Sequence, residues 1–331
     1  MGLLAAIAGL IHPAPPPDPA THQALERIAE QVDPLLKTVA DFEKRLAAPA
    51  HHAIGYCEGF SNGVPGPIAV DRAAFGTDPL VHALFATPDD IHRMLGHSQS
   101  IRDYLADPAS LLHDDLYFVL AARRQEKTQL GLGLNGSVIQ NDVPQTLLYF
   151  CDHAAVFPAP SLDALKQRVR QEALDSLLNS FRAHVDTLRA EREELRTEAS
   201  AARGHLTLLR QCSACGEDVA VQTRRLEELD TRLREDANAL QPDHLVDALA
   251  NFLLIPERSL SLEPVHITVD RVGVVQEPAA ASAVDVDTIS FPELHARDRR
   301  RFVVMYAMVR REEAQQAVEE VKDLQRRYMI L

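Results

Sequence analysis

The sequence is poor in cysteine, with four in 331 residues. Small secreted domains that depend on disulfides carry many more, so the chain has no disulfide framework. Cys57 and Cys151 stand alone in the sequence, and we expect them to be buried as small apolar side chains. This use of cysteine is typical of a reducing compartment, and it predicts a cytoplasmic protein.

Basic residues are also few, because 34 Lys and Arg stand against 48 Asp and Glu, a net charge of −14. Non-specific binding to nucleic acid needs many phosphate-neutralising cations, so we expect no nucleic-acid partner. Docking on anionic membrane surfaces is disfavoured for the same reason. The charge balance therefore leaves other proteins, including a second copy of the chain, as the expected partners.

Long apolar runs are lacking too. The apolar segment 3–11 is nine residues long, whereas a membrane-spanning helix needs about 20. No Lys or Arg precedes it, so it does not match a secretory signal. A proline-rich spacer follows. We expect either a short helix that packs on its own fold, or a tethered peptide that docks on another protein or a membrane face.

Several catalytic motifs are missing. The chain has no Gly-Lys-Ser/Thr, Gly-x-Ser-x-Gly, His-Glu-x-x-His or Asp-Phe-Gly. Residues 131–138 match the glycine pattern of nucleotide loops, but Ser-Val-Ile follows as a strand and no lysine occurs between Lys127 and Lys166. This segment predicts a β-hairpin, with Asn135-Gly136 at its turn.

Heptad repeats are the strongest pattern that the chain does contain. Apolar residues recur every seventh position in one series, with a second series between them that is broken by Arg192. The first series is Leu174, Phe181, Leu188, Leu195, Ala202 and Leu209. After Gly216 the spacing resumes at Val219, Leu226, Leu233 and Leu240. This predicts two helices that pair as a coiled coil, either within one chain or between chains.

A Cys-x-x-Cys interrupts the heptads at Cys212 and Cys215, and Gly216 follows it. Two thiolates at this spacing can bind one zinc ion, and a structural site needs four ligands. The segment 212–216 and its helical flanks resemble the zinc hook of the SMC-like DNA-repair ATPases. That resemblance implies that Cys212 and Cys215 of two copies share one zinc. The ATPase head of that family is absent, so only the geometry is carried over. A redox pair and two ordinary thiols are the other interpretations.

Histidines and carboxylates gather around residues 113–153. The candidate catalytic residues are His113, Asp114, Asp152 and His153, which would form a metal or general acid–base site if the ends of the expected strands converge. Capping and surface roles are the alternative.

The remaining patterns predict the fold. Residues 49–79, rich in Gly and Pro, are expected to be irregular, and Thr87-Pro88-Asp89-Asp90 predicts a helix start. Together the patterns predict an α+β protein that is mainly helical. It has a small N-terminal antiparallel β-meander of three or four strands, a long central helical hairpin, and a C-terminal three-stranded antiparallel sheet plus a helix.

The predicted segments are consecutive. They are an N-terminal apolar peptide and spacer (1–20), an α+β domain (21–157), the helical hairpin (158–241) and a C-terminal α+β segment (242–331). We predict a non-enzymatic scaffold or adaptor that forms a homodimer through its coiled coil, with zinc at the Cys-x-x-Cys as the one candidate cofactor. The N-terminal peptide or the C-terminal helix could bind another protein. The alternative is a hydrolase-like enzyme that uses the His/Asp group.

Overall fold

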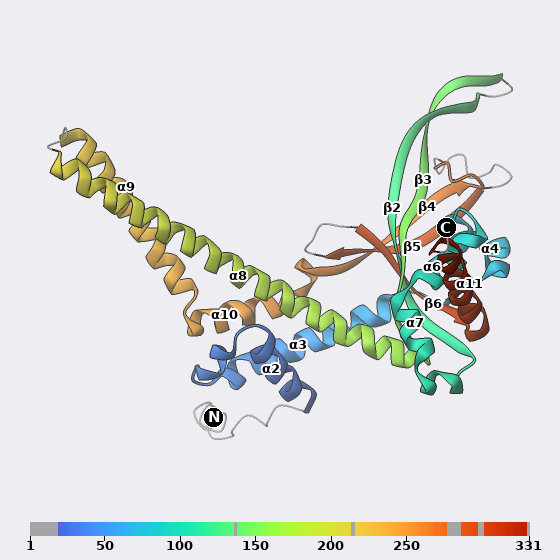
Figure 1. The fold of residues 1–331 in the computed structure, drawn as a ribbon, viewed down its shortest axis with the longest axis horizontal. Coiled ribbons are helices and arrows are strands. Elements are labelled where there is room, and N and C mark those ends of the chain that lie inside the picture. The colour runs from blue at the N-terminus through green and yellow to red at the C-terminus, as the bar shows by residue number, and fades with distance from the viewer. Residues whose placement is uncertain (1–18, 136–137, 213–215, 277–285, 297–300, 330–331) are drawn as a thin grey trace, which may run out of the picture. The chain divides into compact units, whose positions relative to one another are not determined.

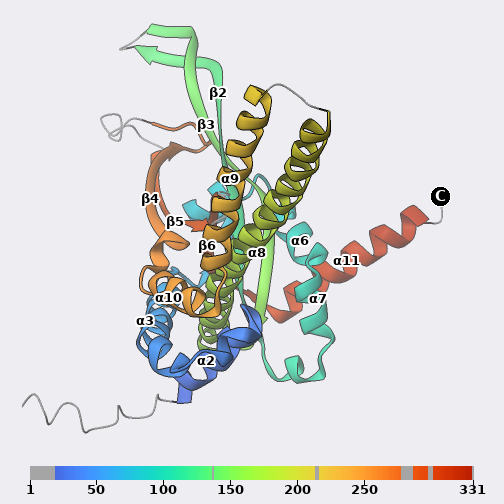
Figure 2. The ribbon, with the colours of Figure 1, turned by 90° about the vertical axis from the view of Figure 1, so that its left-hand side faces the viewer.

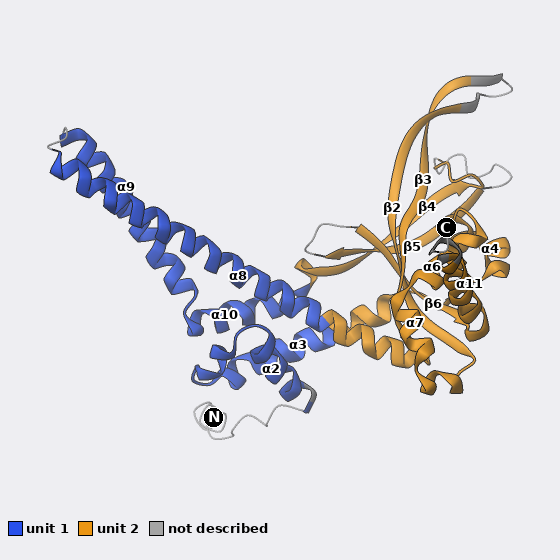
Figure 3. Cartoon of the chain, viewed as in Figure 1, with its two compact units in different colours: residues 1–56, 174–256 blue, residues 57–173, 257–331 orange. Residues whose placement is uncertain are grey.

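The fold is known from a computed structural model, which describes residues 19–135, 138–212, 216–276, 286–296 and 301–329. The chain divides into two compact units, each built from two separated segments (Figure 3). Unit 1 comprises residues 1–56 and 174–256, and unit 2 comprises residues 57–173 and 257–331. The segments predicted from the sequence, in contrast, are consecutive.

Unit 2 is built on a six-stranded sheet (Figure 1). Its strands are β1 (Ile68–Ala69), β2 (Asp115–Asn135), β3 (Val138–Ala159), β4 (Leu260–Asp270), β5 (Val286–Ala296) and β6 (Arg301–Arg310). The order is β3-β2-β6-β5-β4, with antiparallel pairing throughout, and the short β1 adds to β6 in parallel. β2 pairs with β6 only as far as Arg123, so the rest of the β2–β3 ribbon extends beyond β6.

This single sheet shows that the predicted fold class is wrong. The described residues form neither a separate N-terminal meander nor a separate C-terminal sheet, and among them β1 is the only strand before Asp115. The physical reason lies in β6, where Val303 to Ala307 are all buried. A strand that is buried on both faces needs a neighbour at each edge. β2 is that neighbour on one side, whereas β5 (at Arg301 to Val303) and β1 (at Ala307 and Met308) are neighbours on the other, so both halves of the chain share one sheet.

Alternate residues of β2 face two cores, as strand geometry requires. Leu116, Phe118 and Leu120 pack into one hydrophobic cluster, and Val119 packs into the other with Leu165 of α8 (Leu162–Gln211). Helices of unit 2 contribute to the first cluster. The helices of this unit are α4 (Arg72–Thr77), α5 (Pro79–Leu84), α6 (Pro88–His97), α7 (Gln99–Ala106), the 3-10 helix η2 (Pro108–Leu112) and α11 (Arg311–Met329).

The start of α6 confirms the predicted capping signal. Thr87 and Asp90 form a capping box, and the Thr87 N–H donates to the Asp90 carboxylate at 2.9 Å. The expected irregular stretch 49–79 is wrong, however, because α3 (Phe42–Gly63) continues through Pro49. Ala53 and Cys57 are buried one helical turn apart, so packing of this face outweighs the helix-breaking signal of Pro and Gly.

The loop after β4 joins the two outer strands of the sheet. The Asp270 carboxylate accepts hydrogen bonds from the N–H groups of Val272 (3.0 Å) and Val274 (2.9 Å). Gly273 has φ +84°, and its carbonyl accepts the Leu148 N–H of β3 at 2.8 Å. Because β3 and β4 lie at opposite ends of the strand order, this contact brings both edges to one place.

Unit 1 is helical. It contains α2 (Pro19–Gln31), the 3-10 helix η1 (Pro34–Thr38), the first part of α3, α8 (Leu162–Gln211) from Leu174 onward, α9 (Gly216–Ala239) and α10 (Pro242–Leu253), after which η3 (Pro256–Arg258) begins. At its base the buried Asp33 caps η1 by accepting the Leu35 N–H at 2.9 Å, and it pairs with Arg189 of α8. Beyond this base, α8 and α9 run side by side as a hairpin (Figure 2).

Candidate functional site

The predicted catalytic residues do not form one site. His113 and Asp114 lie immediately before β2, and both are exposed. Asp152 lies on β3 and pairs with Arg123 of β2 at 2.9 Å. Arg123 is nine residues beyond Asp114, which corresponds to roughly 30 Å along a strand at about 3.3 Å per residue. His153, next to Asp152, is therefore also far from His113.

His153 has a structural role that explains its position. Its ring stacks on Phe85, with the ring centroids 4.6 Å apart, and its Nε2–H donates to the Leu84 carbonyl at 2.6 Å. Burial lowers the pKa of His153, which favours the neutral ring. The histidine thus anchors the end of α5 to β3.

The predicted metal residues lie at the tip of the hairpin. Cys212 is exposed at the end of α8, and Cys215 lies outside the described residues. Within the described ranges, no group of three or more His, Cys, Asp or Glu side chains is placed to hold a metal ion. Zinc therefore stays a prediction that involves the tips of two copies.

The seam of the hairpin is filled within one chain. Leu195, Ala199, Ala202 and Leu229 are buried together, with Leu226 and Leu233 packed against them. These are the a and d positions of the heptads that the sequence shows. The predicted break at Arg192 is exposed. Because the seam is already occupied, any second copy must bind on another face of the hairpin.

Ion pairs identify the two edges of the hairpin. With Ala199 at a and Ala202 at d, Glu198 is a g residue and Arg203 an e residue. Glu198 pairs with Arg225 of α9 at 2.5 Å, and Arg203 pairs with Asp230 at 2.5 Å. In an antiparallel pair, g residues meet along one edge and e residues along the other. The observed pairs follow this rule, so the heptad assignment locates every outward position.

One edge carries two large exposed apolar side chains near the tip. Leu208 is 59% exposed and Val221 is 61% exposed. Both occupy c positions, which flank the g edge in each helix. Leu208 lies four residues before Cys212 and Val221 five residues after Gly216, so they stand at the same level of the hairpin. We call this pair the tip patch. The heptad pattern of the sequence locates both c positions.

The C-terminal helix offers less surface than expected. Ala314, Ala317, Val318 and Val321 of α11 are buried, with Ala314, Ala317 and Val318 in the same cluster as Met94 of α6. The apolar stripe of this helix is thus used inside unit 2. The apolar N-terminal peptide lies outside the described residues.

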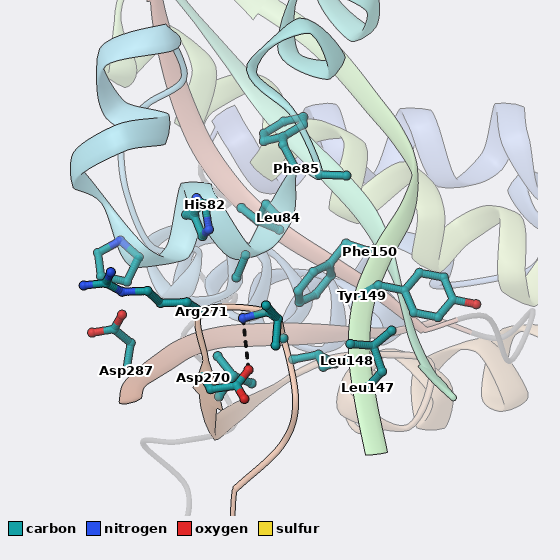
Figure 4. A pocket seen from close by; sticks show the side chains of 16 residues that line it. His82, Leu84, Phe85, Leu147, Leu148, Tyr149, Phe150, Asp270, Arg271 and Asp287 are labelled. Atoms are coloured by element: carbon teal, nitrogen blue, oxygen red, sulfur yellow. Dashed lines mark hydrogen bonds between the residues drawn. The ribbon is translucent and has the colours of Figure 1, made fainter. Parts of the chain in front are cut away.

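Unit 2 contains a pocket of about 360 Å³ between α5, β3 and the loop after β4 (Figure 4). Leu84, Phe85, Leu148 and Phe150 supply apolar walls, and His82, Asp270, Arg271 and Asp287 supply polar groups. No sequence signal links these segments, because contacts that are distant along the chain bring them together.

Comparison of the chain with protein-family models, curated proteins and solved structures finds no match. Among the described residues, no helix combines the length and apolar character that a membrane crossing requires.

Proposed function

We propose that this protein is a non-enzymatic cytoplasmic scaffold or adaptor that self-associates through the tip patch of its α8–α9 hairpin. The observation that carries the proposal is the presence of Leu208 and Val221 at one level and on one edge of a charged arm. The cytoplasmic location rests on the low cysteine content.

The part of the α8–α9 hairpin beyond Leu188, which we call the arm, is long. From Leu188 to Gln211, α8 extends roughly 36 Å at about 1.5 Å per residue. Its seam is narrow because Ala199 and Ala202 are small, and surface ion pairs contribute about 0–1 kcal/mol each. A hairpin of this kind adds little to the stability of the helices at its base. Its main contribution is therefore the exposed surface that it presents.

A twofold axis parallel to the arm fits the tip patch. This axis sets α8 of one copy against α9 of the other, so Leu208 of each copy meets Val221 of its partner. Burying the exposed parts of these four side chains would contribute about 5 kcal/mol before association costs. The same axis brings the two Cys212 residues together at the tip, as a shared zinc requires.

The tip patch can be tested with matched double variants. Leu208→Glu with Val221→Glu places two charges on the g edge, whereas Thr207→Glu with Ala220→Glu places the same charges at exposed b positions on the e edge. Light scattering after size exclusion should show a dimer for the wild type and the control pair, and a monomer for the tip-patch pair. A monomeric wild type, or equal dimers of both pairs, would contradict the proposal.

Zinc is tested separately. Native mass spectrometry of the wild type should show a dimer with one zinc ion if the two tips share the metal, and Cys212→Ser with Cys215→Ser should remove the ion. A metal-free dimer would leave the tip patch as the contact and remove zinc from the proposal.

A further inference from the structure

The pocket beside β3 has the features of a ligand site. Its volume of about 360 Å³ falls in the range of small-molecule pockets, which is about 300–1,000 Å³. Phe85 and Phe150 are held rigidly, since Phe85 stacks on His153 and Phe150 makes an edge contact with Phe291 at 5.4 Å. A rigid apolar wall lets a ligand bind without first ordering the side chains that receive it.

The polar groups of the pocket carry a net negative charge. Asp270 and Asp287 supply two carboxylates, and Arg271 supplies one guanidinium, which lies near Asp287 in Figure 4. The Asp270 carboxylate already accepts two backbone N–H groups of its own loop. Asp287 is exposed on β5. His153, behind Phe85, favours its neutral form and adds no balancing cation.

These observations select one chemical class. We propose that the pocket binds a small organic cation, with its ammonium group at Asp287 and its apolar or aromatic body against the wall that Leu84, Phe85, Leu148 and Phe150 form. The carboxylates attract the ammonium, and the apolar walls favour the apolar body. A ligand carboxylate would instead meet two like charges around a guanidinium that is already close to one of them.

The probe is 2-phenylethylamine, compared with neutral 2-phenylethanol and anionic 3-phenylpropanoate in ligand-observed NMR titrations of the full chain. The titrations are run at pH 8, where histidine side chains in general are mostly uncharged. We expect the amine to bind about tenfold more tightly than the alcohol, since a hydrogen bond between charged groups is stronger than a neutral one. The acid should bind more weakly than either.

Three variants locate the site. Asp287→Asn should bring the affinity of the amine to that of the alcohol, whereas Glu319→Gln, an exposed carboxylate on α11, should leave it unchanged. Ala86→Trp fills the pocket from an exposed lining position and should abolish binding of the amine and the alcohol. Thermal unfolding by circular dichroism shows that each variant is folded.

Three results would overturn the inference. The first is an acid that binds as tightly as the amine, which would identify an anion site at Arg271. The second is binding that survives Ala86→Trp. The third is the absence of amine binding at millimolar concentration.

Discussion

Two glycine substitutions in unit 2 should change its stability in opposite directions. Gly96 lies in α6 where α11 approaches most closely, and a Cβ added there would stand 2.4 Å from the Ala317 carbonyl oxygen and 2.6 Å from Val321 Cγ2. The oxygen belongs to a helix backbone and cannot move away alone. Gly59 lies in α3 with nothing within 4 Å of the added Cβ.

The magnitudes follow from these surroundings. Overpacking costs about 1–3 kcal/mol, so Gly96→Ala should lower the free energy of unfolding by roughly that amount. Gly59→Ala should raise it by about 0.5–1 kcal/mol, because alanine is the better helix former and restricts the unfolded chain.

Urea unfolding followed by tyrosine fluorescence measures both changes in the free energy of unfolding and reports mainly on unit 2. The chain has no tryptophan, and Tyr104, Tyr117, Tyr149 and Tyr306 lie in unit 2. A Gly96→Ala protein as stable as the wild type would show that α6 and α11 are not in this close contact. If Gly96→Ala and Gly59→Ala changed the free energy of unfolding in the same direction, the expected difference between a crowded and an open glycine would be refuted.

Three further predictions concern buried polar groups of unit 2. Arg124→Met should cost about 3–5 kcal/mol in urea unfolding, because it leaves Glu293, 3% exposed and 2.8 Å from Arg124 Nε, as an uncompensated buried charge. Tyr306→Phe should cost about 1–2 kcal/mol, since the phenol donates to the Ser61 carbonyl at 2.8 Å inside the core. His153 has a lowered pKa in the folded state, so the unfolded chain gains protons first as the pH falls below about 6.5, and the wild type should lose stability there. His153→Gln should flatten this dependence, and an unchanged slope would contradict it.

Local signals predicted local structure well. The capping box at Thr87 and Asp90 and the heptads from Leu195 to Leu233 act between residues a few turns apart, so the sequence shows them directly. The sheet could not be found in this way. The apolar run of β6 predicts a buried strand, but nothing in the run states that β2, almost 200 residues earlier, is its neighbour.

The candidate sites also differ in whether they depend on local sequence signals or on contacts between distant segments. The tip patch follows from the heptad positions, so the sequence alone is enough to place Leu208 and Val221 at exposed c positions. The pocket depends on the Leu148–Gly273 contact between the two outer strands, and its His82 and Asp287 are some 200 residues apart. The structure does not bring the His/Asp group together, because long strands separate residues that an expected short meander would have placed side by side.

The register of the hairpin connects the ion pairs with the proposed assembly. Glu198 and Arg225 are 27 residues apart, and so are Arg203 and Asp230. If α8 slipped by one heptad toward the tip relative to α9, Glu198 would lie against Asp218, and two like charges would meet on the g edge.

Each ion pair is weak at the surface, and the repulsion between Glu198 and Asp218 disfavours this slipped register, which the small alanines of the seam would otherwise tolerate. The register matters for the tip patch because a slip of one heptad moves Val221 by about 10 Å relative to Leu208 at about 1.5 Å per residue. The two apolar side chains would then no longer stand at one level. The charged edges of the hairpin therefore favour the register that the proposed self-association through the tip patch requires.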